Sequence, residues 1–213
     1  MLVRCEAALM TRRDDRQGGI VIISGPSGVG KSTICRGIIE RVDNACLSVS
    51  ATTRAKSRGE VNGRDYWFIS EKEFRRRIDD GLLLEYAEVF GHLYGTPRDK
   101  VEEALRTGRT VILEIDVQGG KQVKSFFPEA KMIFILPPTA KVLAERLSGR
   151  GRDDAEIAEK RLEGADAEIA AAWQYYEHMV INDDLQQAID ECVKIIETKK
   201  RESQSSIATK DEK

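Results

Sequence analysis

A glycine-rich segment near the N-terminus has the residue types and spacing of a phosphate-binding loop. Residues 25–32 read GPSGVGKS and match the pattern G-x-x-x-x-G-K-[ST]. Glycines let backbone N–H groups turn toward an anion, the lysine reaches the terminal phosphates, and the hydroxyl binds Mg²⁺. We therefore expect a nucleoside triphosphate site, with Ser32 as a metal ligand, formed by Gly25, Pro26, Ser27, Gly28, Val29, Gly30, Lys31 and Ser32.

The residues on either side of this loop support the interpretation. A β-branched run at 20–23 predicts a buried strand before the loop, and apolar residues at helical spacing follow it. These residues are Ile34, Ile38, Ile39 and Val42. The alternative is a glycine-rich turn at the start of a helix with no ligand. A strand before the loop and a helix after it favour nucleotide binding.

Two acidic residues end another apolar run and are candidates for the magnesium side of the site. Glu114 and Asp116 close the sequence TVILEID at 110–116. They are two positions apart, which puts them on one face of a strand. Which of the two lies nearer the metal stays open. Strand-end carboxylates that cap the following turn are the alternative.

A polar segment at 50–69 indicates a second phosphate-binding surface. It combines hydroxyls, guanidinium groups and a tyrosine in SATTRAKSRGEVNGRDYWFI. Arginine binds a phosphate with two parallel hydrogen bonds and tyrosine adds a neutral donor, so the segment suits a phosphate monoester. A solvated β-hairpin could carry the same residues. On these residues alone, an NTPase, a small-molecule kinase and a nucleotide-regulated switch all remain open.

Strand-like and helix-like patterns alternate along the chain and predict an α/β fold, with a parallel sheet covered by helices on both faces. Further strands are expected at 110–116, 131–136 and 180–181. The stretch 48–96 breaks this rhythm and is interpreted as an inserted subdomain. Within it, Ser70 predicts an N-cap, and Thr96 before Pro97 predicts another helix start.

Composition excludes several classes of protein. The 213 residues contain 34 Lys+Arg and 36 Asp+Glu, a net charge of −2, which argues against a nucleic-acid binder. No apolar run is long enough to span a membrane, and residues 1–17 are too charged for a secretory signal, so we expect a cytoplasmic protein. The cysteines lack metal-binding spacing and are interpreted as small apolar residues: Cys5, Cys35, Cys46 and Cys192.

The segment at 50–69 and several later motifs resemble the guanylate kinase family. The run S-x-TTR…GEV-x-G-x-x-Y-x-F looks like the signature of that family. The resemblance continues through EYAEVFGHLYGT at 85–96, IDVQG at 115–119, ILPP at 135–138, LSGRG at 147–151, KRL at 160–162 and VIND at 180–183. It covers residues 18–198, which leaves an N-terminal extension at 1–17 and a polar tail at 199–213 that we expect to be frayed or disordered.

The resemblance implies transfer of a phosphoryl group from ATP to GMP with Mg²⁺, on a phosphate-loop core with a GMP-binding insertion and a lid at about 148–165. By analogy with the family, the GMP phosphate is held by Ser50, Arg54, Tyr66 and Tyr94. Guanine is read by Glu85, Thr96 and Asp116, while Asn182 and Asp183 lie near adenine. Arg150 and Arg161 of the lid contact the transferring phosphoryl group and act in catalysis with Lys31 and Arg54.

Two positions depart from the family pattern. The basic residue expected three positions after Arg54 is Ser57, flanked by Lys56 and Arg58. We favour Arg58 in that catalytic and GMP-binding role. The alternative is a phosphate site with one guanidinium fewer. Glu114 stands where the family usually has Asp, which lengthens the carboxylate by one methylene.

Two other functions remain as alternatives. One is a catalytically inactive, guanylate-kinase-like module that binds protein, and the other is a kinase for AMP or dTMP. The intact loop at 25–32 weighs against the first, and Glu85 with Thr96 weighs against the second. We expect ATP and GMP as partners, neither nucleic acid nor membrane, and a monomer or weak homo-oligomer.

Overall fold

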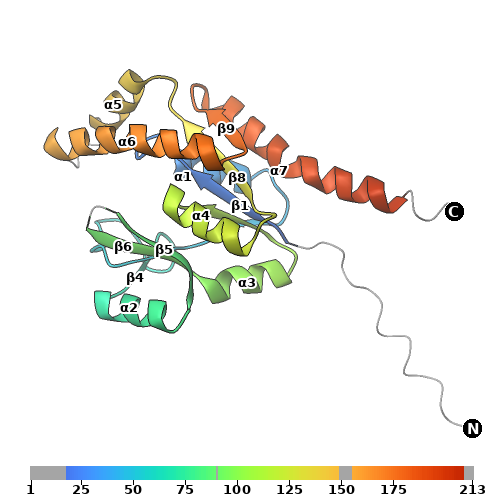
Figure 1. Cartoon of the computed structure of the whole chain (residues 1–213), viewed down its shortest axis with the longest axis horizontal. Helices are drawn as coiled ribbons and strands as arrows, with labels where there is room; N and C mark the ends of the chain where they lie inside the picture. Colours follow the sequence, from blue (N-terminus) through green and yellow to red (C-terminus); the bar gives the residue numbers. More distant parts are fainter. Residues whose placement is uncertain (1–17, 90, 149–154, 209–213) are drawn as a thin grey trace, which may run out of the picture.

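The computed structural model describes residues 18–89, 91–148 and 155–208, with the backbone alone at 148, 155–163 and 199–208 (Figure 1). The core is a parallel sheet of five strands in the order β2-β7-β1-β8-β9. The strands are β2 (Ala45–Leu47), β7 (Thr110–Glu114), β1 (Ile20–Ser24), β8 (Lys131–Leu136) and β9 (His178–Ile181). Helices cover both faces of this sheet, so the predicted α/β fold is confirmed.

Side chains alternate between the two faces of β1 and enter two separate apolar cores. Val21 and Ile23 pack with α1 (Lys31–Ile39), α5 (Ala140–Ser148) and α7 (Leu185–Ala208). Ile20 and Ile22 pack on the other side, against α3 (Arg98–Arg106), α4 (Val117–Phe126) and α6 (Ala155–Tyr175). A strand buried on both faces needs apolar residues at every position, which explains the continuous runs in the sequence.

The stretch that interrupts the alternation forms a second, smaller sheet. Its order is β4-β3-β6-β5, and it lies below α4 in Figure 1. The strands are β3 (Ala51–Thr52), β4 (Trp67–Phe68), β5 (Leu83–Val89) and β6 (His92–Pro97). Helix α2 (Glu71–Asp79) packs on this sheet through Phe74, which is fully buried with Ala51 and Leu83. Ser70 caps α2 as predicted, accepting a hydrogen bond from the Glu73 N–H.

Two helix ends, the start of α3 and the end of α7, differ from the sequence-based expectations. Thr96 does not cap α3: it lies in β6 with its hydroxyl turned to Glu85, and Pro97 is the N-cap residue. Asp184 caps α7, since its carboxylate accepts from the Gln187 N–H. The backbone of α7 stays helical to Ala208, whereas a frayed tail was expected from residue 199. Lys, Arg, Glu and Gln are good helix formers, and no Gly or Pro interrupts the segment.

The structure also bears on the membrane-span and cysteine expectations. None of the helices in the described ranges has the length and apolar character that a membrane span requires. Cys35 and Cys192 are buried free thiols and Cys46 is half-buried, which fits their interpretation as apolar side chains. Cys5 lies outside the described residues.

Candidate active site

A cavity of about 400 Å³ lies where the carboxyl edge of the central sheet faces the second sheet. Open parallel sheets bind ligands at this edge, because loops after neighbouring strands meet there. The cavity brings together most of the residues that the sequence analysis selected. Those that line it are Gly25, Ser27, Gly28, Gly30, Lys31, Ser32, Ser50, Tyr66, Glu85, Tyr94, Glu114 and Asp116.

The loop between β1 and α1 has the conformation that its glycines predict. Gly28 and Gly30 have φ of 84° and 103°, a region that other residues enter only with strain. Gly30 is the N-cap of α1, so the positive end of the helix faces the cavity. The Lys31 ammonium donates to the carbonyl oxygens of Gly25 and, at 3.1 Å, Pro26, which holds it within the loop.

Ser32 and Glu114 join the phosphate loop to the end of β7. The Ser32 hydroxyl donates to Glu114 Oε1 at 2.7 Å. A hydroxyl and a carboxylate oxygen are the hard donors that Mg²⁺ prefers. No set of three or more Asp, Glu, His or Cys side chains placed to hold a metal occurs in the described part of the chain.

A buried polar corner lies at the other end of the cavity, where β5, β6 and α4 meet. The Thr96 hydroxyl donates to Glu85 Oε1 at 2.6 Å, and both residues are buried. Gly119 lets the carboxylate approach α4, since a Cβ at that position would lie 2.4 Å from Glu85 Oε2. Asp116 caps α4 through the Gly119 N–H. Burial and the nearby Asp116 raise the pKa of Glu85 to about 7.

Two tyrosines form the wall of the cavity on the second sheet. The rings of Tyr66 and Tyr94 meet edge to face, with 5.9 Å between centroids, and Ser50 lies in the same lining. Burial and the charge of Glu114 raise the pKa of Tyr66 to about 12. Its hydroxyl therefore stays a neutral hydrogen-bond donor at physiological pH.

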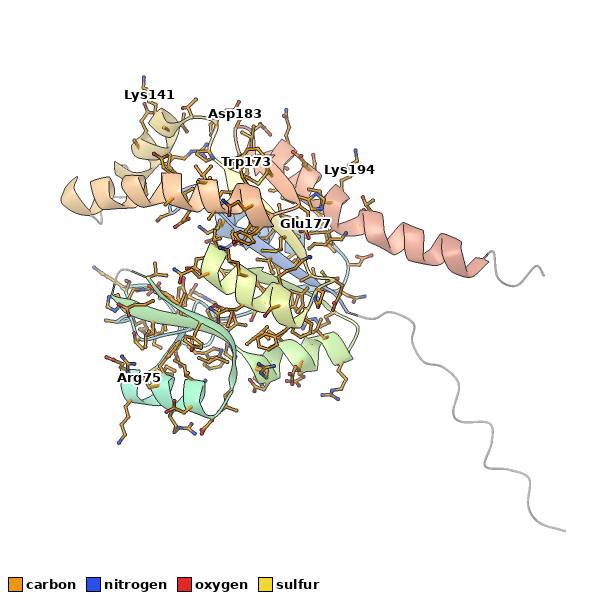
Figure 2. The ribbon with its side chains drawn as sticks, in the orientation of Figure 1. Arg75, Lys141, Trp173, Glu177, Asp183 and Lys194 are labelled. Carbon is orange, nitrogen blue, oxygen red and sulfur yellow. The ribbon has the colours of Figure 1, made fainter. Side chains whose placement is uncertain are left out.

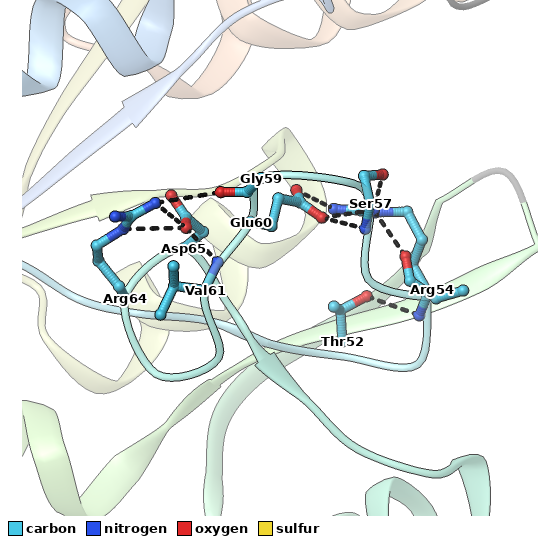
Figure 3. Close-up of polar contacts among 9 residues, drawn as sticks. Thr52, Arg54, Ser57, Gly59, Glu60, Val61, Arg64 and Asp65 are labelled. Atoms are coloured by element: carbon cyan, nitrogen blue, oxygen red, sulfur yellow. Dashed lines mark hydrogen bonds and ion pairs between the residues drawn. The ribbon is translucent and has the colours of Figure 1, made fainter.

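Arg54 lies behind this wall and is held by Glu60 (Figure 3). Its guanidinium donates to both carboxylate oxygens, at 2.7 and 3.1 Å, and stacks 5.3 Å from the Tyr66 ring centroid. Ser57 belongs to the same group: its hydroxyl accepts from Arg54 at 3.0 Å and its N–H donates to Glu60 at 2.7 Å. Ser57 thus supports Arg54 and does not supply a positive charge.

Several predicted residues lie outside the lining of the cavity. Arg58 is exposed, and neither it nor Arg54 belongs to the lining in this arrangement. Asn182 is buried and donates to the Val29 carbonyl oxygen at 2.7 Å, so it supports the phosphate loop from below. Asp183 is exposed in the turn between β9 and α7 (Figure 2).

The predicted lid is described only in part. Arg150 lies outside the described residues, and Arg161 belongs to α6 with its backbone alone described. Helix α6 nevertheless reaches the cavity, which it lines with Gly164 and Glu168.

Glu168 is a site residue that the sequence analysis missed. Burial and the nearby Asp116 raise its pKa, and Lys31 acts in the opposite direction. A signal was present in the sequence, because Glu168 falls on the same helical stripe as Ala165 and Ala172, which are buried. A charged residue on the buried stripe of a helix is unusual and indicates a polar cavity beneath it.

The fold and this cavity define a class of protein. A phosphate loop at the carboxyl edge of a parallel sheet, facing a second sheet with its own polar pocket, is the architecture of a phosphate-loop nucleoside monophosphate kinase. The family model described as guanylate kinase matches residues 17–199. The chain belongs to the guanylate kinase family.

Individual relatives agree with this assignment. A guanylate kinase of Synechocystis sp. is 48% identical over 180 residues, which cover 84% of this chain and 94% of the relative. The guanylate kinase of Carboxydothermus hydrogenoformans is 45% identical over 184 residues, covering 86% and 90%. The crystal structure of guanylate kinase from Anaplasma phagocytophilum superposes with a TM-score of 0.71 at 33% identity, covering 85% of this chain and 86% of that one.

Proposed function

We propose that this protein transfers the γ-phosphoryl group of ATP to GMP, giving ADP and GDP. The observation that carries the proposal is that one cavity is lined both by the phosphate loop and by Glu85, whose buried carboxylate accepts a hydrogen bond from Thr96 behind it. The first feature suits a triphosphate, and the second suits a base with several hydrogen-bonding groups on one edge. An ATPase would need the first feature alone.

Guanine recognition is assigned to the corner formed by Glu85, Thr96 and Asp116. An ionised Glu85 can accept hydrogen bonds from N1–H and the 2-amino group of guanine, while the Thr96 hydroxyl can rotate to donate to O6. Adenine lacks the 2-amino group and carries a donor at the position of O6. It would leave these buried groups without partners, which is a strong form of discrimination.

The phosphate of GMP is assigned to Ser50, Tyr66 and Tyr94, which line the cavity, and to Arg54 behind them. A phosphate that enters from the cavity side competes with Glu60 for the Arg54 guanidinium. Arg58 is exposed and needs a rearrangement of its loop to take part. The acceptor phosphate would thus be held by neutral hydroxyls and by one guanidinium that it shares with Glu60. This limits the affinity for GMP and allows the product to leave.

Phosphoryl transfer depends mainly on positioning and on neutralising charge. Lys31 is assigned to the β- and γ-phosphates, and the N–H groups of the loop to the same oxygens. Arg150 and Arg161 are assigned to the transferring group when the lid closes, and Asn182 with Asp183 to the adenine side. No general base is required, because the phosphate of GMP is an anion near neutral pH.

Mg²⁺ is assigned to Ser32, with Glu114 next to it and Asp116 on the guanine side. When bound, Mg²⁺ supplies charge neutralisation for the β- and γ-phosphates. The hydrogen bond between Ser32 and Glu114 orients the hydroxyl at the start of α1. The contact between Ser32 and Glu114 is our reason for assigning Glu114, rather than Asp116, to the metal side of the site.

The test is an ADP-release assay with ATP, Mg²⁺ and GMP, AMP or dTMP in turn. Turnover that requires GMP supports the proposal, and turnover with AMP or dTMP would assign another substrate. Nucleotide binding without turnover would favour the inactive binding module, which the family assignment and the intact phosphate loop disfavour. We also propose a cytoplasmic enzyme that is a monomer or weak homo-oligomer, to be measured by fractionation and by sedimentation.

A further inference from the structure

The face of α6 that points to the central sheet carries four residues spaced four apart. Gly164 and Glu168 line the nucleotide cavity, Ala172 is fully buried, and Tyr176 follows the last turn of the helix. The Tyr176 N–H still donates to the Ala172 carbonyl oxygen at 2.9 Å, so it continues the helical pattern. Tyr176 therefore lies at the opposite end of this stripe from the residues that reach the cavity.

The hydroxyl of Tyr176 begins a buried chain of hydrogen bonds. It donates to Ser24 Oγ at 2.6 Å, and Ser24 Oγ donates in turn to the carbonyl oxygen of Ile115 at 2.7 Å. Ser24 immediately precedes the phosphate loop, and Ile115 lies between Glu114 and Asp116. These two hydrogen bonds thus connect the end of α6 to the start of the phosphate loop and to the segment after β7 that carries Glu114 and Asp116.

Packing fixes the Tyr176 side chain in this position. Its ring meets Phe134 of β8 edge to face, with 5.4 Å between centroids. The first turn of α4 makes room for the hydroxyl, since a Cβ on Gly120 would lie 2.5 Å from the Tyr176 oxygen. Burial raises the pKa of Tyr176, so the hydroxyl keeps its proton and remains a donor throughout the neutral range.

We propose that Tyr176 is a positioning residue for phosphoryl transfer, which holds the cavity-facing stripe of α6 in register with the phosphate loop through Ser24. This inference rests on the proposed function. Arg161 is seven positions before Glu168 and therefore on the same side of α6. A rotation of the helix would displace Arg161 relative to the phosphate loop, and a small displacement of a catalytic cation from the reacting phosphates lowers the rate.

The test compares Tyr176→Phe, Ser24→Ala and the double variant with the wild-type chain. Tyr175→Phe is the matched control, because Tyr175 is the exposed neighbour whose ring contacts Lys121. The kcat, the KM for GMP and the ratio of ADP to GDP formed are measured well below the Tm of each variant. That ratio reports ATP lost to water when the site is misaligned.

We expect Tyr176→Phe to lower kcat about tenfold, the size of change that one buried hydrogen bond can supply. The KM for GMP should stay within about twofold, because the base and phosphate contacts remain. The ADP to GDP ratio should rise, and the double variant should be no slower than the slower single variant. Tyr175→Phe should behave as the wild type.

A lower Tm with unchanged kcat and an unchanged ADP to GDP ratio would give Tyr176 a purely structural role and overturn the inference. Additive losses in the double variant would overturn the route through Ser24. If Tyr176→Phe does not fold, Ser24→Ala alone carries the same expectations for kcat and the product ratio. A wild-type chain without GMP-dependent turnover would refute the proposed function itself, which is a separate result.

Discussion

Glu85, which lines the cavity, accepts a hydrogen bond of 2.6 Å from Thr96 on the neighbouring strand of the second sheet. The two residues are 11 apart in sequence and face each other in the β5–β6 ladder. Because burial raises the pKa of Glu85 to about 7, its charge state changes in the range where the protein works.

The KM for GMP should therefore depend on pH. Ionised Glu85 can accept from both donors of guanine, whereas protonation turns one of its oxygens into a donor, so KM should rise as the pH falls below the Glu85 pKa of about 7. The phosphate of GMP titrates near pH 6, so the clearest range is roughly pH 6.5 to 8.5. The KM for ATP serves as the control and should stay flat. A KM for GMP that is constant across this range would contradict the role of Glu85.

Glu85→Gln should stabilise the protein at alkaline pH. The folded state keeps a proton on Glu85 up to about pH 7, while the unfolded chain releases it near 4.5, so stability falls as pH rises between these values. Glutamine carries no charge, so the variant does not lose stability as the pH rises. Its Tm should therefore exceed that of the wild type most at high pH. Each kcal/mol recovered is worth about 2–4 °C.

The control for this stability measurement is Glu88→Gln, an exposed residue of the same strand. Its Tm should follow the wild type at every pH. Glu85→Gln should also lose the preference for GMP over AMP. If Glu85→Gln leaves both the Tm and the preference for GMP over AMP unchanged, then burial of the Glu85 carboxylate does not destabilise the fold and Glu85 does not contact the base.

Lys31→Ala should lower kcat by about 10²–10³-fold, the range observed when one preorganised electrostatic contact to developing charge is removed. The Lys31 ammonium is held by carbonyl oxygens of its own loop, so the loss should be catalytic with a small effect on Tm. Lys72→Ala, an exposed change on α2, is the control. Full turnover by Lys31→Ala would remove the phosphate loop from the mechanism.

Ser57→Arg should lower the KM for GMP severalfold if the acceptor phosphate site has one guanidinium fewer than its relatives. A charge-assisted hydrogen bond contributes ~1.5–3 kcal/mol, and part of this is offset because the variant loses the Ser57 hydroxyl that accepts from Arg54. Arg58→Ala is the companion variant. A loss of GMP affinity in Arg58→Ala, with no gain in Ser57→Arg, would show that Arg58 enters the site on binding.

Glu168→Gln should lower the KM for ATP a few-fold. The carboxylate lines the cavity and acts electrostatically on Lys31, so it opposes the entry of phosphates. Asp166→Asn removes the same charge from an exposed position of the same helix and should change nothing. A higher KM in Glu168→Gln would instead indicate that the carboxylate accepts a hydrogen bond from the nucleotide.

The parallel sheet and the phosphate loop could both be predicted from local patterns in the sequence. A buried parallel strand needs apolar residues on both faces, and a phosphate loop needs glycines and a lysine at fixed spacing, so both leave local patterns. Ser70 as the cap of α2 follows from the same kind of local rule, because capping joins residues only three apart. The family signature then indicated which residues to expect where the second sheet faces the cavity.

Contacts between segments that are distant in the sequence could not be predicted from such patterns. Thr96 has the local sequence of a helix cap, but β6 still pairs with β5 at this residue and brings its hydroxyl to Glu85, so Pro97 is the N-cap residue of α3 instead. Ser32 and Glu114 are 82 positions apart, and only the folded sheet brings the hydroxyl to that carboxylate. Tyr176 and Ser24 are 152 positions apart, and only the packing of α6 on the sheet makes their hydrogen bond.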